Sequence, residues 1–152
     1  MTTHPSLAQL LAESSIVLDA TATDVDDAVR QAGAALVATG AVDPEYVDAM
    51  LERERTVSTY VGEGVAVPHG TLAAKGAVRR NALVLLRLAD GLDWNGNDVR
   101  IVIGLAAVGR GHIGLLSRLA GILLDPDRAA ALRTATDTAE VYRALSADAP
   151  TP

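Results

Sequence analysis

Two histidines of this 152-residue chain stand next to glycine in stretches that would leave an imidazole ring able to react. His69 lies between Pro68, which stiffens the backbone before it, and Gly70, which lets a ligand or another protein approach closely. Near neutral pH one imidazole nitrogen keeps a free lone pair, and histidine is known to form covalent intermediates. The pattern makes His69 a candidate phosphoryl acceptor, although a lone histidine in a turn is more often an ordinary surface residue.

The residues after His69 suit an anion. Thr71 is placed to cap a helix that follows it, and it offers a hydroxyl group. Free backbone N–H groups at such a helix start would bind a phosphate. We therefore take Gly70 and Thr71 as candidate phosphate-binding residues.

A second histidine and an arginine could act with His69. His112 is expected at the start of a helix, where the helix dipole disfavours the imidazolium form and favours a neutral ring that donates a hydrogen bond. A guanidinium such as that of Arg53 binds phosphate through paired hydrogen bonds. The plainer interpretations are a helix-capping histidine and a charge on a solvated helix end. Because the ends of elements in an α/β sheet gather at one crevice, we expect His112 to lie beside His69.

Apolar periodicity predicts the elements that hold these residues. Helices are expected at 7–12, 24–39, from an Asp43 cap to 55, at 112–124, from 125–126 onward, and after an Asp137–Glu140 capping box. Strands are expected at 16–18, 59–61, 65–67, 82–88 and 99–107, with a turn at 90–91. The helix at 112–124 is apolar nearly all round and should be largely buried. The alternation predicts an α/β fold with a sheet between helices, whose strand order the sequence does not give.

The length and composition of the chain exclude several classes of protein. The length fits a single domain over residues 1–152, with a core at about 7–145 and loose ends. A formal net charge of −6 argues against nucleic acid as a partner, and the absence of cysteine excludes disulfides and thiolate catalysis from this chain. No stretch reads as a signal peptide or is long enough to cross a bilayer, so we expect a cytoplasmic protein with no membrane insertion.

Six stretches, above all the block at 59–71 with Pro68-His69-Gly70, resemble the mannitol/fructose enzyme IIA family of the bacterial phosphoenolpyruvate-dependent sugar phosphotransferase system. The other five are 43–47, 49–51, 53–54, 102–104 and 112–113. The resemblance implies an α/β fold with a mixed parallel and antiparallel sheet. It implies that His69 is phosphorylated, that His112 is a second active-site histidine and that Arg53 helps to hold the phosphoryl group.

The same resemblance implies the partners. Such a domain accepts phosphate from the histidine carrier protein HPr and passes it to a cysteine of enzyme IIB, for uptake of mannitol or a related sugar. Because this chain has no cysteine and no membrane segment, we expect the IIB and IIC parts to be separate, and we expect no cofactor. The small, basic loop 109–111 and a short turn at 90–98 depart from the family pattern and bear on partner contacts.

Three alternatives remain open at this stage. A regulatory relative would use the same phosphorylated histidine to signal, without sugar transport. A metal-dependent hydrolase would use His69 and His112, but no carboxylate stands at ligand spacing from either histidine. A pure interaction module is the third alternative, and the acidic composition gives it no direct support.

Overall fold

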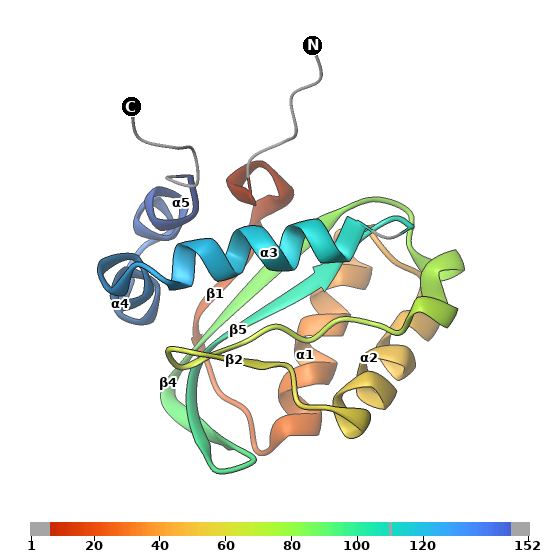
Figure 1. Ribbon diagram of the computed structural model, residues 1–152, viewed down its shortest axis with the longest axis horizontal. Helices are drawn as coiled ribbons and strands as arrows, with labels where there is room; N and C mark the ends of the chain where they lie inside the picture. The colour runs from red at the N-terminus through yellow and green to blue at the C-terminus, as the bar shows by residue number, and fades with distance from the viewer. Residues whose placement is uncertain (1–6, 110, 147–152) are drawn as a thin grey trace.

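The computed structural model describes residues 7–109 and 111–146, in which five strands form one mixed sheet (Figure 1). The strands are β1 (Leu11–Ala20), β2 (Tyr60–Gly62), β3 (Val65–Ala66), β4 (Ala82–Trp94) and β5 (Asn97–Ala106), in the order β1-β4-β5-β3-β2. β1 pairs with β4 and β3 with β5 in parallel, whereas β4–β5 and β2–β3 are antiparallel. The predicted mixed sheet is confirmed.

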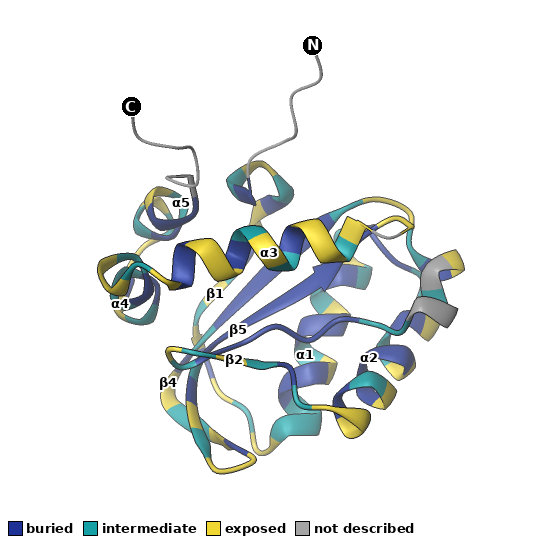
Figure 2. Ribbon diagram, viewed as in Figure 1, coloured by how far each residue is buried: buried dark blue, intermediate teal, exposed yellow. Residues whose placement is uncertain are grey.

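Helices cover both faces of this sheet. They are α1 (Val25–Ala38), α2 (Glu45–Thr56), α3 (Gly111–Leu123), α4 (Pro126–Thr134) and α5 (Thr138–Ser146), with short 3-10 helices η1 (Leu7–Leu10) and η2 (Leu72–Ala77). One apolar core lies between the sheet and α1 and α2, and a second lies between the sheet and α3, α4, α5 and η1. Figure 2 shows the central strands buried between the two layers.

Three features of the first half depart from the prediction. The predicted helix at 7–12 is a single 3-10 turn, after which β1 runs from Leu11 and is much longer than the predicted 16–18. Asp43 was expected to cap α2, but the helix begins at Glu45 without a side-chain cap. The Asp43 carboxylate instead accepts hydrogen bonds from the Arg79 guanidinium at 3.0 and 3.1 Å, so a tertiary ion pair replaces the cap.

The predicted turn at Asp90-Gly91 is wrong, because β4 continues through it to Trp94. The β4–β5 register shifts between Arg87 and Leu92, and Gly91 has a φ of +70°, which is the geometry of a bulge within a strand. The chain reverses at Asn95-Gly96, where both residues have positive φ, as the tightest hairpins require.

Helix α3 is buried on one face only, so the prediction that it is largely buried is wrong. Leu115, Leu119, Ile122 and Leu123 face the core, whereas Ile113 is 62% exposed. The starts of α4 and α5 follow the prediction, since Asp125 and Asp137 each accept a hydrogen bond from a backbone N–H of the first turn. The ends that were predicted to be loose, 1–6 and 147–152, lie outside the described residues. No helix in the described part of the chain has the length and apolar character to cross a membrane.

Candidate active site

The extended chain after β3 places His69 beside the carboxyl end of β5. The N–H of Leu105 donates to the carbonyl of Pro68 at 3.0 Å, and His69 forms an isolated parallel bridge with Leu105. The chain then leaves β5 and begins α3 at Gly111, which brings the start of that helix to the same edge of the sheet (Figure 1). The fold therefore joins two loops that are far apart in sequence.

A backbone hydrogen bond fixes the orientation of the His69 ring. Nδ1 lies 2.9 Å from the carbonyl oxygen of Val67, and a carbonyl can only accept, so Nδ1 carries the proton. In the neutral ring the lone pair is then on Nε2. His69 is only 6% exposed, so the ring is held by its surroundings and Nε2 is its nucleophilic atom.

The surroundings keep the His69 ring neutral near pH 7. Burial is the main cause that lowers the pKa of His69 below its ordinary value of 6.5, and the charges of Arg53 and His112 lower it further. The hydrogen bond to Val67 and the Glu54 carboxylate oppose this shift without reversing it. A neutral ring is the form that can attack phosphorus.

His112 lies beside His69, as the sequence predicted. The two ring centroids are 6.0 Å apart, and the ring planes are inclined by 24°. His112 is the second residue of α3 and is half-buried. The two imidazoles are therefore close enough to contact one phosphoryl group.

Arg53 belongs to the last turn of α2. Its Nη1 donates to the carbonyl of Val57 at 2.8 Å, which holds the guanidinium at the end of the helix. Its charge lowers the pKa of His69, so the guanidinium is within electrostatic reach of the ring. This placement agrees with Arg53 as a candidate site residue.

Gly70 is required for a different reason from the predicted one. Its N–H donates to the hydroxyl oxygen of Tyr46 at 2.8 Å and is therefore not free for a phosphate. A Cβ at Gly70 would stand 2.5 Å from Cε1 of Tyr46, so only glycine fits against this ring. Thr71, with Tyr46 and His112, lines a cavity of about 20 Å³, which is room for one water molecule and no more.

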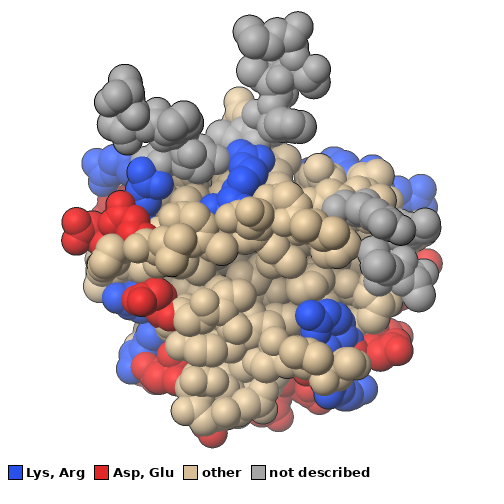
Figure 3. Space-filling view, in the orientation of Figure 1, with Lys and Arg blue, Asp and Glu red and all other residues tan. Residues whose placement is uncertain are grey.

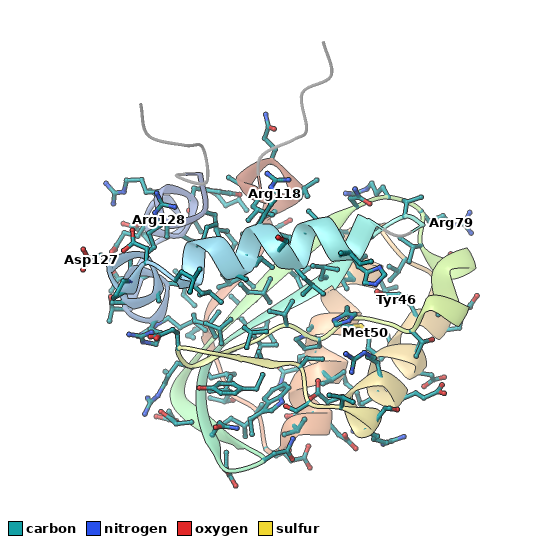
Figure 4. All side chains as sticks on the ribbon, viewed as in Figure 1. Tyr46, Met50, Arg79, Arg118, Asp127 and Arg128 are labelled. Carbon is teal, nitrogen blue, oxygen red and sulfur yellow. The ribbon has the colours of Figure 1, made fainter. Side chains whose placement is uncertain are left out.

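Tyr46 is a site residue that was not among the candidates from the sequence. It lies between α2 and the sheet, near the start of α3 (Figure 4). Its hydroxyl accepts from Gly70 and donates to the carbonyl of Leu105 at 2.9 Å, so it ties the His69 loop to β5. Burial raises the pKa of Tyr46, which keeps the phenol protonated and able to donate.

Glu54 was also missed. This buried carboxylate accepts from the N–H and hydroxyl of Thr59 at 2.9 and 2.5 Å and from the indole N–H of Trp94 at 3.0 Å. It fixes the end of α2 to the start of the segment that leads to His69. The helical spacing Tyr46, Met50, Glu54 placed it on the buried face and was the signal that could have found it.

The described residues contain no group of three His, Cys, Asp or Glu side chains placed to hold a metal ion. The third histidine, His4, lies outside them.

Comparison with known proteins identifies the family. Residues 9–148 match the family model described as the phosphoenolpyruvate-dependent sugar phosphotransferase system, EIIA 2. The chain belongs to this family. The family agrees with the resemblance noted from the sequence and with the oriented His69 ring at the edge of the sheet.

Named relatives include proteins much longer than this EIIA 2 chain. A multiphosphoryl transfer protein of Xanthomonas campestris is 41% identical over 145 residues, which are 95% of this chain and 17% of that protein. The mannitol-specific EIICBA component of Pasteurella multocida is 39% identical over 146 residues, 93% of this chain and 23% of that protein. The mannitol-specific enzyme IIA component of Staphylococcus aureus is 40% identical over 114 residues, 75% of this chain and 79% of that protein. The chain therefore spans less than a quarter of the first two.

Solved structures share the EIIA 2 fold. Mannitol IIA of Escherichia coli has a TM-score of 0.82 at 38% identity, covering 88% of this chain and 97% of that one. A complex of that organism's IIA and phosphorylated IIB for mannitol gives 0.84 at 37% identity, covering 90% and 98%. The nitrogen regulatory protein IIA-Ntr of Neisseria meningitidis gives 0.78 at 25% identity, covering 91% and 97%.

Proposed function

We propose that this EIIA 2 domain is a phosphoryl carrier that accepts phosphate from phospho-HPr on Nε2 of His69 and passes it to a cysteine of enzyme IIB, for uptake of mannitol or a related sugar. The observation that carries the proposal is the buried His69 ring, whose Nδ1–H is held by the Val67 carbonyl and whose Nε2 lone pair is free. Mannitol-specific relatives near 40% identity support the sugar.

The tautomer of His69 determines which ring nitrogen takes part in phosphoryl transfer. The Nε2 lone pair attacks phosphorus on the donor histidine of HPr, the new P–Nε2 bond forms, and the electron pair of the old P–N bond returns to the donor ring. Nδ1 keeps its proton, so positive charge develops on the His69 ring, and the Val67 carbonyl stabilises that charge. When a IIB thiolate attacks phosphorus in turn, the His69 ring leaves as neutral imidazole.

The two other side chains act on the charge of the phosphoryl group. Arg53 offers a guanidinium, and His112, 6.0 Å from His69 between ring centroids, offers a ring N–H. Donors in these places are proposed to stabilise the oxygens as phosphorus passes between acceptors. His112 does not carry phosphate itself. Thr71 lies beside them and is proposed to contact the phosphoryl group, whereas Gly70 serves by its lack of a side chain.

The surface around the site suits a protein partner. The cavity beside His112 is far too small for a sugar, and Val108 and Ile113 next to it are 52% and 62% exposed. Figure 3 shows a largely uncharged face over α3. Exposed apolar residues that gather beside a reactive group mark a docking surface. We place this carrier in the cytoplasm, where its proposed partners act.

A signalling role without transport is the alternative. It is less favoured, because the nitrogen regulatory relative is 25% identical and the mannitol-specific relatives are 39–40% identical.

Transfer to a purified mannitol enzyme IIB tests the proposal. The chain is first labelled with phosphoenolpyruvate, enzyme I and HPr, and then mixed with IIB or with its Cys→Ser variant. The label is expected to move to IIB and to stay on the chain with the variant. Stable labelling without transfer to any sugar-type IIB would favour the signalling alternative and contradict the transport function.

A further inference from the structure

A separate cavity lies at the other end of the sheet from His69. A cavity of about 530 Å³ opens where β3 and β5 begin and α4 ends, and three arginines line it: Arg87, Arg100 and Arg133. Figure 3 shows charged side chains gathered at the left edge of the molecule, below α4. Arg100 and Leu105 are five residues apart on β5, or about 17 Å along an extended strand. This cavity is therefore separate from the site at His69.

Arg87 is held in place without a counter-charge. Its Nε donates to the carbonyl of Arg133 and its Nη1 to the carbonyl of Leu18, both at 3.0 Å. The side chain is half-buried, yet it makes no ion pair with any residue in the described part of the chain. Burial of a charge is costly unless an opposite charge accompanies it. An anion bound in the cavity would supply the counter-charge that Arg87 lacks.

The other two arginines have only exposed acidic partners. Nε of Arg100 lies 2.9 Å from Asp98, and Nη1 of Arg133 lies 3.5 Å from the carboxylate of Glu63. The Asp98 and Glu63 side chains are 64% and 51% exposed, so solvent weakens both pairs. Three guanidinium charges thus face two screened carboxylates, in a chain whose net charge is −6.

Backbone carbonyls orient the same arginines. Arg100 donates through Nη1 to Ala89 at 3.1 Å, and Arg133 donates through Nη1 to Glu63 at 2.7 Å. In all three side chains Nη2 makes no hydrogen bond with the described residues. Oriented donors that remain available are what a bound anion needs.

We propose that this cavity binds a small organic phosphate, held by Arg87, Arg100 and Arg133. A phosphate ester carries up to two negative charges and three terminal oxygens, so it can pair with more than one guanidinium. The cavity volume lies within the usual range for small-molecule sites, about 300–1,000 Å³, and leaves room for an organic body beside the phosphate.

NMR titration of the full chain with glycerol 3-phosphate tests this site separately from His69. The backbone amides of Gly64, Arg100 and Thr134 are expected to shift saturably, whereas those of Gly70 and His112 report any binding at the His69 site. Arg100→Gln is expected to weaken binding about tenfold or more, since it removes a charge-assisted hydrogen bond. Arg87→Lys keeps the charge, loses the fork and should weaken binding as well.

Arg30→Gln is the matched control, because Arg30 is exposed on α1, on the other face of the sheet, and the change removes the same charge. It should leave the affinity within about twofold, as expected for a distant site. Thermal unfolding verifies that each variant folds, and Arg100, 42% exposed, is the change least able to disturb the core. Three results would overturn the proposal: no shifts around Gly64, shifts only around Gly70 and His112, or binding of citrate but not of glycerol 3-phosphate.

Discussion

Replacement of Tyr46 by Phe removes one oxygen atom that makes two buried hydrogen bonds, to Gly70 at 2.8 Å and to Leu105 at 2.9 Å. Each lost bond costs about 1–2 kcal/mol when its partner stays buried, so unfolding free energy should fall by about 2–4 kcal/mol. For a chain of this length that corresponds to a decrease in Tm of roughly 5–15 °C. Phosphoryl transfer should slow as well, because the loop that positions His69 loses its link to β5.

Tyr142→Phe provides the control. The Tyr142 hydroxyl donates one bond, to the carbonyl of Leu11 at 2.7 Å, in a different part of the molecule. This variant should lose about half as much stability and transfer phosphate at the wild-type rate. Differential scanning calorimetry measures the change in Tm, and a quenched phosphoryl-transfer assay measures the change in rate. If Tyr46→Phe matches the wild type in both Tm and rate, Tyr46 does not position the loop.

Four further predictions concern the site. Arg53→Lys should fold normally but transfer phosphate at least about tenfold more slowly, because the charge stays and the paired hydrogen bonds are lost. A wild-type transfer rate would mean that Arg53 is only a charge on a solvated helix end. His112→Gln should still permit phosphorylation of His69, whereas His112→Ala should slow transfer far more than it lowers Tm; the proposed role fails if both variants transfer equally fast. Glu54→Ala should lower the free energy of unfolding by about 3–5 kcal/mol, since three hydrogen bonds are lost. The fluorescence emission of Trp94, the one tryptophan, should also shift to the red in the folded state. Unchanged emission would contradict the hydrogen bond between Trp94 and Glu54. The pKa of His69 is lower in the folded than in the unfolded chain, so the unfolded state binds more protons below about pH 6.5, and the free energy of unfolding should fall as pH falls through that value. Urea titrations of His69→Gln should show a smaller fall. An identical pH dependence in this variant and the wild type would refute the lowered pKa.

Much of the fold was predictable because strong local signals agree with the tertiary structure. The apolar stripe of α1 and the Asp125-Pro126 start of α4 are local in origin, and both were predicted. The errors arose where two local signals competed. Asp90-Gly91 is a turn signal, but the chain used the stronger Asn95-Gly96 hairpin and kept Gly91 as a bulge in β4. Asp43 has capping chemistry, but the distant Arg79 engages it instead.

The site was predicted in part. The proximity of His69 and His112 could be inferred because both lie where sheet elements end. Tyr46 could not be recognised, because its partners Gly70 and Leu105 are 24 and 59 residues away. The hydrogen bond from the Gly70 N–H to the Tyr46 hydroxyl could not be predicted for the same reason, since nothing local shows that a tyrosine hydroxyl accepts from it.

Intact-mass analysis after incubation with phosphoenolpyruvate, enzyme I and HPr identifies the residue that accepts the phosphoryl group. One phosphoryl group should be added to the wild-type chain and to His112→Ala, in an acid-labile and base-stable form, and none to His69→Ala. A phosphoryl group that persists on His69→Ala, or that disappears only from His112→Ala, would contradict the assignment of His69 as the acceptor.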